Sequence, residues 1–531
     1  MTREIGRTWP QHRIREYVDG QIANLPTQED LSGAGGAERV GYSAGLANAI
    51  PRTVMLKLRE SVSVMDYGAR GDGVNDDTEY FRAAMEVSSS TPRAVLLPPA
   101  PGGYLITDQI DIPSSRSVIG SGFASRLLRR GTGWPQGRAV FRNASNQAGN
   151  RNIVFSKVYI DGFRSEYGGS EEPFCYLFHT SDPVNNRCTD IYFEGCEVHN
   201  WIGITYRFNG ADRVRVTGCV ANNNKRGGIV FARAGRDIVI AGNLCLNLGD
   251  DAIALNANEA IADAGIHERF AVVGNVTLGR GDAQWGAGII VRGGRRGTIA
   301  GNFCRNHQNA GIVVDDYFQH TPDDIAITGN TVTGGFAEGI RLRADVATGI
   351  AIKGNTVNAT ARHGIRVGRG DGARPTSLVN IEVKNNRVRS AGNADNATSR
   401  GIFVEGTSSE SAAQLEVEGN QVDNSAGNGI ELSLPVTHGS VSGNSVRNSS
   451  AFTTNSRQVQ VNRLSKGRVS DNTVTESRGT KLNLRGISID ANCSALLVAD
   501  NFSLNSDTAS GNGVFVDAAA TNITSQGNKV T

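Results

Sequence analysis

A short repeat in the second half of the chain constrains its fold more than any other feature. An asparagine, in most cases preceded by glycine, recurs with a mean spacing of 28.5 residues. The repeated residues are Asn243, Asn275, Asn302, Asn330, Asn355, Asn386, Asn420, Asn444, Asn472, Asn501 and Asn528. A period of about 20 to 50 residues is typical of solenoid proteins, in which a repeat buries its apolar side chains only by stacking on its neighbours.

A second pattern follows the asparagine in most repeats. A small residue precedes an isoleucine that begins a segment of alternating apolar residues, as at Gly203-Ile204, Gly228-Ile229, Ala252-Ile253, Gly288-Ile289, Gly311-Ile312, Gly339-Ile340, Gly364-Ile365 and Gly401-Ile402. Such segments, separated by Gly and Asn turns, are typical of the strands of a parallel β-solenoid. Adjacent strands lie about 4.8 Å apart, so a buried turn asparagine can hydrogen-bond the asparagines of the coils above and below. The sequence therefore predicts an all-β solenoid of roughly twelve or more coils.

The N-terminal part of the chain has a different pattern. Residues 1–60 are predicted to form a helical stem and leader, with a helix over 10–25 and a short helix over 53–60. The β-solenoid is predicted to occupy residues 61–531, with an N-terminal module over 61–130 and regular coils from about 150 to 531.

Within that module, short elements precede the regular coils. Asp76 and Asp77 are expected to cap a helix over 78–87, because carboxylates at this place accept hydrogen bonds from the first helical N–H groups. The first strands are predicted over 94–97 and 104–112.

Charge and composition exclude several classes of function. The 54 Lys and Arg residues nearly balance the 52 Asp and Glu residues, whereas a nucleic-acid binder carries a large basic excess. No run approaches the roughly 18 apolar residues of a membrane helix, and the first residues lack the apolar stretch of a secretory signal. The seven cysteines stand singly, without a CxxC pair, so we expect buried free thiols. Neither nucleic acid nor a membrane is expected as a partner.

Several motifs in the N-terminal module resemble a known superfamily. They are Val62-Ser63-Val64-Met65-Asp66-Tyr67-Gly68-Ala69-Arg70-Gly71-Asp72-Gly73-Val74-Asn75-Asp76-Asp77-Thr78, Val95-Leu96-Leu97-Pro98-Pro99, Gly103-Tyr104 and Val118-Ile119-Gly120-Ser121-Gly122. Together they resemble the first module of the pectate-lyase-like right-handed parallel β-helix superfamily, and residues 40–60 resemble the leader of phage and prophage tailspikes. The resemblance implies a right-handed parallel β-helix that acts on carbohydrate. It also implies a homotrimer on the virion tail, attached to the tail or baseplate through its N-terminus.

Aligning the coils on the second pattern predicts which side chains stack. The isoleucine and the residue two later point inward, so the residues one and three positions later face outward. One outward column then reads Thr205, Val230, Ala254, Ile290, Val313, Arg341, Arg366, Phe403 and Glu431, and the other reads Arg207, Ala232, Asn256, Arg292, Asp315, Arg343, Gly368, Glu405 and Ser433. Arg292, Asp315 and Arg343 are therefore predicted to form a charged ladder, which either binds substrate or is a solvated ion-pair surface.

An acidic pair precedes one of these strands. Asp250 and Asp251 resemble the Gly-Asp-Asp segment of polygalacturonase-type glycoside hydrolases, and the resemblance implies that they serve as general acid and base. This chain has Gly227 and Ala287 where that family has a catalytic Asp and a His. We therefore predict that Asp282, on the following loop, supplies a further carboxylate. The alternative is that the pair only bonds loop amides.

Further candidates are predicted on the same face. Arg341 and Arg343 resemble the Arg-x-Lys segment that holds a uronate carboxylate in those hydrolases, and arginine forms bidentate contacts with carboxylates. Residues 280–374 hold twelve Lys and Arg against eight Asp and Glu, which suits an anionic polysaccharide. The remaining candidates are Asp315, Asp316 and Glu338 for catalysis and Arg292, His363, Arg366, Trp285 and Tyr317 for substrate binding.

These patterns favour a tailspike-like depolymerase that cleaves an acidic bacterial surface or exopolysaccharide within the chain. An endo-acting glycoside hydrolase is the preferred interpretation, with no cofactor or metal. The first alternative is a polysaccharide lyase, in which Arg or His removes the proton α to a uronate carboxylate and Asp315 and Asp316 place a divalent cation. The second is a binding-only adhesion spike, which the residues Gly227 and Ala287 favour.

Overall fold

The structure is a computed structural model that describes residue 15 and residues 27–86, 93–130, 137–166, 173–182, 185–257, 266–280, 286–317, 320–335, 337–368, 377–406, 411–449, 457–478, 485–504 and 513–530. The chain divides into two compact units, Met1–Ser63 and Val64–Thr531. The predicted helix over 10–25 lies outside the described residues, apart from residue 15.

The first unit contains short helices and strands. Thr27 begins a helix with a capping box, in which its hydroxyl accepts the N–H of Asp30 and the Asp30 carboxylate accepts the N–H of Thr27. The Thr53 hydroxyl accepts the N–H of Leu56, which places a short helix within the predicted range 53–60. The elements are α2 (Gln28–Ser32), α3 (Gly36–Arg39), β1 (Gly41–Tyr42), β2 (Arg52–Thr53), α4 (Val54–Leu58) and β3 (Ser61–Ser63), with β1 and β2 antiparallel.

The second unit begins with η1 (Val64–Tyr67) and α5 (Thr78–Glu86). The Asp76 carboxylate accepts the N–H of Thr78, at the start of α5. The prediction for Asp77 was wrong, because its carboxylate accepts the N–H groups of Arg70 and Gly71 instead. Asp77 therefore fixes the preceding turn rather than capping the helix.

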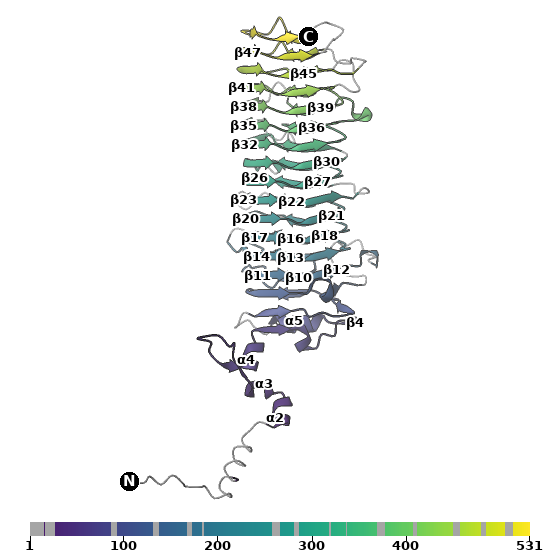
Figure 1. The fold of residues 1–531 in the computed structure, drawn as a ribbon, viewed down its shortest axis with the longest axis vertical. Coiled ribbons are helices and arrows are strands. Elements are labelled where there is room, and N and C mark those ends of the chain that lie inside the picture. Colours follow the sequence, from purple (N-terminus) through teal and green to yellow (C-terminus); the bar gives the residue numbers. More distant parts are fainter. Residues whose placement is uncertain are drawn as a thin grey trace, which may run out of the picture. The chain divides into compact units, whose positions relative to one another are not determined.

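All later strands form three parallel sheets, and each coil contributes one strand to each sheet (Figure 1). Sheet 1 contains β5 (Ala94–Leu96), β8 (Arg116–Ile119), β11 (Arg151–Ser156), β14 (Cys188–Glu194), β17 (Ala211–Thr217), β20 (Gly235–Ala241), β23 (His267–Val273), β26 (Gly294–Ala300), β29 (Asp323–Thr328), β32 (Val346–Lys353), β35 (Ser377–Lys384), β38 (Ser411–Glu418), β41 (Val436–Ser442), β44 (Gly467–Ser470), β47 (Leu496–Ala499) and β50 (Thr524–Gln526).

Sheet 2 contains β4 (Asp72–Asp76), β6 (Gly103–Leu105), β9 (Leu127–Leu128), β12 (Tyr159–Asp161), β15 (Glu197–His199), β18 (Val220–Asn222), β21 (Leu244–Leu248), β24 (Val276–Gly279), β27 (Phe303–Arg305), β30 (Thr331–Thr333), β33 (Thr356–Asn358), β36 (Arg387–Arg389), β39 (Gln421–Asp423), β42 (Ser445–Arg447), β45 (Thr473–Thr475), β48 (Phe502–Leu504) and β51 (Lys529–Val530). Short 3₁₀ turns lie between strands at η2 (Gly122–Ser125), η3 (Arg164–Glu166) and η5 (Ala394–Asn396).

Sheet 3 contains β7 (Ile110–Ile112), β10 (Ala139–Asn143), β13 (Phe174–His179), β16 (Tyr206–Asn209), β19 (Ile229–Phe231), β22 (Ile253–Asn256), β25 (Ile289–Arg292), β28 (Ala310–Asp315), β31 (Glu338–Arg343), β34 (Ile365–Val367), β37 (Ile402–Val404), β40 (Ile430–Leu432), β43 (Arg457–Val461), β46 (Arg485–Ile489) and β49 (Val514–Val516). The single strand predicted over 104–112 was wrong, because the chain turns within this range and places β6 and β7 in different sheets. The arrangement is a right-handed parallel β-helix, the hand that parallel crossovers adopt.

The predicted asparagine stack is confirmed. From Asn243 to Asn528, the backbone N–H and the Nδ2 of each asparagine donate to the Oδ1 of the next, as from Asn330 to Asn355 at 2.9 and 3.0 Å. The same Nδ2 also donates to a carbonyl of sheet 1, as from Asn355 to Ile327 at 2.9 Å. The preceding residue has a positive φ, for example 64° at Gly354, which explains why Gly, Asn or Asp stands there.

The core lies between the three sheets and is filled by stacked side chains. In the N-terminal coils it is aromatic: Tyr176 stacks on Tyr206, and Phe155 on Phe193, with ring centroids 5.2 and 5.0 Å apart. All seven cysteines are free and buried, as predicted. None of the described helices is long and apolar enough to cross a membrane.

Candidate functional site

The outer face of sheet 3 carries most of the predicted site residues. Its register confirms the predicted columns from β19 onward: Val230, Ala254, Ile290, Val313, Arg341 and Arg366 pair in turn, as do Asn256, Arg292, Asp315 and Arg343. The first member of each predicted column was wrong. Tyr206 pairs with Ile229, so Arg207 rather than Thr205 lies beside Val230.

Part of this outer face is apolar and buried. Val230, Ala254, Ala287, Ile290, Ala310 and Val313 pack together as one cluster. The column that contains Val230 and Ile290 was predicted to face outward, and solvent exposure was expected with it. Its four members in the cluster are instead at most 5% exposed. Ala287 in this cluster is the next residue across the sheet from Asp251, so the acidic pair borders an environment of low polarity.

Asp251 and Asp250 immediately precede β22. Asp251 Oδ1 accepts the N–H of Ala287 at 2.7 Å, and Asp250 Oδ1 accepts the N–H of Asp251 at 2.8 Å. Burial raises the pKa of Asp251 to about 6, and the Asp250 carboxylate adds to the rise. The Asp250 side chain is 38% exposed, and its Oδ2 lies 4.0 Å from Nη1 of Arg226. The pair therefore combines a partly buried carboxyl that loses its proton only near pH 6 with a neighbour that is more open to solvent.

A buried carboxylate joins two arginines further along the face. Asp315 Oδ2 accepts Nη2 of Arg343 at 2.9 Å and Nε of Arg292 at 3.3 Å. Arg292 also donates to the side chain of Asn256 at 3.1 Å. Its guanidinium lies 5.4 Å from the ring centroid of Tyr317, a cation–π contact. Burial raises the pKa of Asp315, and the two guanidiniums offset part of the rise.

Asp316, next to Asp315, has a different environment. Its Oδ2 accepts the backbone N–H groups of Asp345 at 2.8 Å and Val346 at 3.0 Å. The side chain is buried in the connection between sheets 3 and 1. These bonds hold the start of β32 on the neighbouring coil.

Glu338 is the centre of an ionic network on the next coils. Its Oε1 accepts Nη1 of Arg366 at 2.7 Å, and its Oε2 lies 3.7 Å from Nη1 of Arg341. Burial favours the neutral form of Glu338, but Arg341 and Arg366 outweigh it and lower the pKa of its carboxyl. Arg366 also donates to Glu405 through its Nε at 2.7 Å. Glu338 is therefore an ionised partner of two arginines.

His363 lies one coil beyond Glu338. Its Nδ1 accepts the backbone N–H of Arg400 at 2.9 Å, and its ring packs on Phe403 with centroids 5.0 Å apart. Burial lowers the pKa of His363 to about 3, and the nearby Arg400 and Arg366 contribute. The imidazole is therefore neutral at physiological pH.

Two predicted site residues, Asp282 and Trp285, lie outside the described residues. Apart from Asp316, which holds the start of β32, the structure brings the other predictions into two groups on the outer face of sheet 3. Asp250, Asp251, Arg292, Asp315, Arg343 and Tyr317 form one, because the charges of Arg292 and Asp315 act on Asp251. Glu338, Arg341, His363 and Arg366 form the other. Among the described residues, no three His, Cys, Asp or Glu side chains form a metal site.

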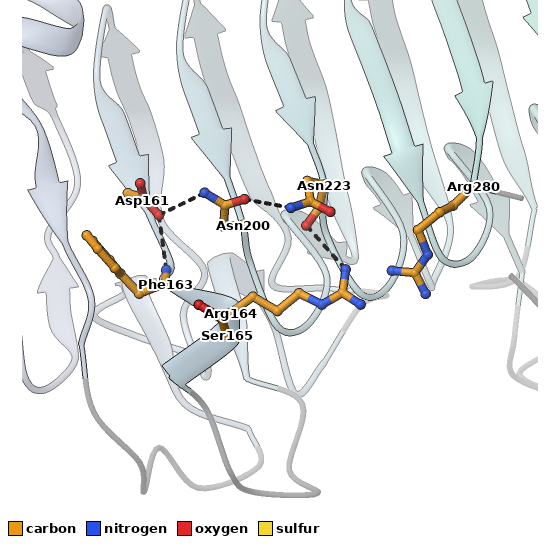
Figure 2. Close-up of a pocket in the computed structure, with 7 residues that line it drawn as sticks. All are labelled: Asp161, Phe163, Arg164, Ser165, Asn200, Asn223 and Arg280. Carbon is orange, nitrogen blue, oxygen red and sulfur yellow. Dashed lines mark hydrogen bonds between the residues drawn. The ribbon is translucent and has the colours of Figure 1, made fainter. Parts of the chain in front are cut away.

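A cavity at the turns that connect sheet 2 to sheet 3 was missed by the sequence analysis. It has a volume of about 470 Å³, and its lining residues are Asp161, Phe163, Arg164, Ser165, Asn200, Asn223 and Arg280 (Figure 2). An asparagine directly after β15 and after β18 was a usable signal. Phe163, Arg164 and Arg280 stand outside the repeat pattern, so nothing in the sequence linked them to these asparagines.

Comparisons with known proteins agree with this architecture. Residues 61–170 match the family model described as rhamnogalacturonase A/epimerase, pectate lyase-like. The pre-neck appendage protein of Bacillus phage B103 is 30% identical over 207 residues, which are 38% of this chain and 22% of that protein. Mannuronan C5-epimerase AlgE2 of Azotobacter vinelandii is 25% identical over 245 residues, or 44% of this chain and 22% of that protein. The chain thus matches less than a quarter of the length of these relatives.

A solved tailspike has the same fold. The tailspike protein of E. coli bacteriophage HK620, in complex with a pentasaccharide, is 13% identical with a TM-score of 0.58. The likeness, which is one of fold, covers 94% of this chain and 85% of that one. The chain therefore carries a pectate-lyase-like module at residues 61–170, within a right-handed parallel β-helix like that of a phage tailspike.

Proposed function

We propose that this chain is a tailspike-like depolymerase that hydrolyses glycosidic bonds within an acidic bacterial surface polysaccharide. The observation that carries the proposal is the pKa of Asp251, which burial and Asp250 raise to about 6. A carboxyl whose pKa is raised to about 6 keeps a protonated fraction in weakly acidic to neutral solution and can donate that proton to a leaving sugar oxygen, while a carboxylate beside it acts as base or nucleophile. In this scheme Asp251 is the acid and the more exposed Asp250 is the base or nucleophile.

The arginines on the outer face of sheet 3 supply the substrate-binding part of the proposal. Arg292 and Arg343 are held by the buried Asp315, so their guanidiniums are oriented before any ligand arrives. Oriented guanidiniums suit planar carboxylates of an acidic polymer. The names of two similar proteins fit a carbohydrate ligand: one is a mannuronan epimerase, and the other was solved with a pentasaccharide.

The runner-up is a polysaccharide lyase, which the surroundings of Arg341 favour. Burial lowers the pKa of Arg341, and the Arg366 and Arg343 guanidiniums contribute, although Glu338 opposes them. A crowded, buried guanidinium releases a proton more readily than an exposed one. In a lyase, Arg341 would take the proton α to a uronate carboxylate, and the product would contain a new carbon–carbon double bond.

The experiment incubates the full chain with a panel of acidic bacterial polysaccharides and measures new reducing ends and ultraviolet absorbance. Hydrolysis predicts reducing ends without absorbance, and a lyase predicts both. The Asp250→Asn, Asp251→Asn double variant should lose cleavage, whereas Asp237→Asn, at an exposed ion pair of sheet 1, should keep it. Full cleavage by the double variant, or binding without cleavage by the native chain, would overturn the proposed hydrolase.

The assembly is a further part of the proposal. We infer that the chain forms a homotrimer whose N-terminal unit, Met1–Ser63, attaches it to a phage tail. The similarity to a phage pre-neck appendage protein supports this placement. Light scattering of the full chain tests it: three copies per particle are expected, and a monomer at micromolar concentration would refute the trimer.

A further inference from the structure

We infer that the cavity at the turns that connect sheet 2 to sheet 3 is a second sugar-binding subsite, which takes an acidic sugar residue of the same polysaccharide. The inference rests on the proposed function, because the ligand is taken to be that polymer. With about 470 Å³, the cavity falls within the range of about 300 to 1,000 Å³ typical of small-molecule sites. Its lining combines hydrogen-bonding side chains, two guanidiniums and an aromatic ring.

A hydrogen-bonded row of side chains forms one wall of the cavity. Asn223 Nδ2 donates to Asn200 Oδ1 at 2.7 Å, and Asn200 Nδ2 donates to Asp161 Oδ1 at 3.2 Å (Figure 2). The three residues lie at or directly after the ends of β12, β15 and β18. Asn200 and Asn223 have φ values of 54° and 57°, a conformation that asparagine tolerates better than most residues. Their amides are thus fixed in a line, and an asparagine amide can both donate to and accept from a hydroxyl group.

Two arginines give the cavity its preference for an acidic sugar. Arg164 extends along the row and its Nη1 lies 3.5 Å from the backbone oxygen of Asn223, while Arg280 approaches from the opposite side (Figure 2). Among the described lining residues the one carboxylate is Asp161, whose Oδ1 accepts the N–H of Phe163 at 3.0 Å and Nδ2 of Asn200. Guanidiniums pair well with a sugar carboxylate, and the cavity offers two of them.

Phe163 supplies an apolar surface for the sugar ring. The Arg130 guanidinium lies 4.4 Å from its ring centroid, which supports the ring from one side. Phe163 and Asp161 also line a neighbouring cavity of about 320 Å³, together with Phe123, Arg126 and Arg130. Two adjacent cavities that share a wall suit consecutive residues of a polymer better than an isolated small molecule.

One lining residue, Arg280, lies beside the acidic pair of the proposed active site. A Cβ atom on Gly249 would lie 3.4 Å from Nη2 of Arg280, so this guanidinium passes beside the residue that precedes Asp250. Arg226, on the coil that precedes the coil of Asp250, has its Nη1 atom 4.0 Å from Oδ2 of Asp250. A polymer seated against Arg164 and Arg280 would therefore extend along the same edge of the coils to Asp250. Loss of Arg164 should weaken binding of the polymer without removing the groups that cleave it.

The test measures binding in the background of the Asp250→Asn, Asp251→Asn double variant, so that cleavage does not interfere. The probes are hexamers of galacturonate and of mannuronate, together with the same hexamers after reduction of their carboxyl groups to neutral alcohols. Calorimetry gives Kd for the parent, for Arg164→Gln and for Arg280→Gln. The matched control is Arg269→Gln, which changes an arginine of β23 on sheet 1 that is ion-paired with Asp237 of the neighbouring strand β20. Thermal unfolding verifies that each variant is folded.

The parent should bind an acidic hexamer at least tenfold more tightly than its neutral counterpart. Arg164→Gln and Arg280→Gln should each weaken acidic binding at least tenfold, and Arg269→Gln should leave Kd unchanged. The subsite is refuted if both cavity variants keep the parent's Kd, or if neither acidic hexamer is preferred over its neutral form. The proposed function fails separately, if the double variant still cleaves polysaccharide, so the two failures are distinguishable.

Discussion

Asp315 Oδ2 lies 2.9 Å from an Nη atom of Arg343, although 28 residues separate the two along the chain. The same oxygen contacts Arg292, 23 residues earlier. The Asp315 side chain is 1% exposed, while those of Arg292 and Arg343 are 23% and 30% exposed. A buried carboxylate thus holds in place two partly exposed arginines, one on the coil before it and one on the coil after it.

Asp315→Asn should lower affinity for acidic polysaccharide. The substitution removes the negative charge that holds the guanidiniums of Arg292 and Arg343 in place, so both arginines lose their fixed orientation before a ligand arrives. Because burial raises the pKa of Asp315, the folded chain disfavours its ionised form, and removal of the charge itself should not lower the free energy of unfolding. Calorimetry with an acidic oligosaccharide should give a Kd roughly tenfold weaker for Asp315→Asn than for Asp237→Asn, whose carboxylate pairs with Arg269 at an exposed position of sheet 1. Equal Kd values for the two variants would contradict this account.

Asp251→Asn should stabilise the chain increasingly as pH rises from 4 to 8. Since the folded chain raises the pKa of Asp251 from 3.8 to about 6, it binds this proton more tightly than the unfolded chain does. The free energy of unfolding of the native chain therefore falls by up to about 3 kcal/mol as pH rises between these two pKa values. Asp251→Asn has no carboxyl at this position and does not show that loss. Melting temperatures of both proteins across this pH range measure the difference.

Asp190→Asn provides the control of opposite sign. Hydrogen bonds from Arg213 lower the pKa of Asp190, so its ionised form stabilises the folded chain above the unfolded pKa. That contribution is lost as pH falls through the folded value. The variant should therefore be less stable than the native chain at pH 8 and similar to it at low pH. A melting difference that is independent of pH in both variants would contradict the assigned shifts.

Cleavage of polysaccharide should decline as pH rises above about 6. The decline reports deprotonation of Asp251 in the free enzyme. Asp250→Asn removes the neighbouring charge and should move the decline of any residual activity to lower pH. His363→Asn should leave the decline where it is, because His363 has a pKa of about 3 and does not titrate there. If the decline disappeared in His363→Asn, the group that titrates would be His363 rather than Asp251.

Asn355→Leu should destabilise the β-helix by at least about 1 to 3 kcal/mol. It removes the acceptor for the backbone N–H and Nδ2 of Asn330 and leaves the Ile327 carbonyl without its donor. A buried polar group without a partner costs about this much. Asn358→Leu, at an exposed position of the same coil, should change stability by about 0.5 kcal/mol or less. The melting temperatures of both variants measure these two changes in stability.

The cysteines should be inert toward thiol reagents in the folded chain. All seven are buried and free, and burial raises the pKa of Cys245 and Cys304 to about 12. Since the thiolate is the reacting form, a disulfide reagent at pH 8 should modify none of them until the chain unfolds. In denaturant all seven should react, which serves as the control. Rapid modification of the native chain would contradict this packing.

Much of the β-helix could be predicted from the sequence because its coils repeat the same turn chemistry. Few residue types adopt the positive φ found at Gly354 and its equivalents, so the same residue types recur at this turn in every repeat. The column alignment worked for the same reason from Ile229 onward. It failed one coil earlier, because Gly203-Ile204 lies in the loop before β16 and only imitates the pattern.

The site could be predicted less completely because its chemistry depends on what lies beside each strand. The alignment placed Arg366 on the outer face, but its partners Glu338 and Glu405 follow from side-chain directions that no repeat specifies. The raised pKa of Asp251 likewise depends on its burial beside an apolar cluster that was expected to be exposed. The cavity around Arg164 is built by residues outside the repeat.

The asparagine stack tolerates coils of very different length. Successive asparagines are 25 residues apart between Asn330 and Asn355 and 34 apart between Asn386 and Asn420, yet the bonds that join them are 3.0 Å in both places. The extra residues are therefore accommodated outside the strands, with no change in how one turn sits on the next. A scaffold of this kind lets its outer segments be exchanged or lengthened independently, so the surface that a ligand meets can change during evolution while the bonded stack of asparagines stays constant.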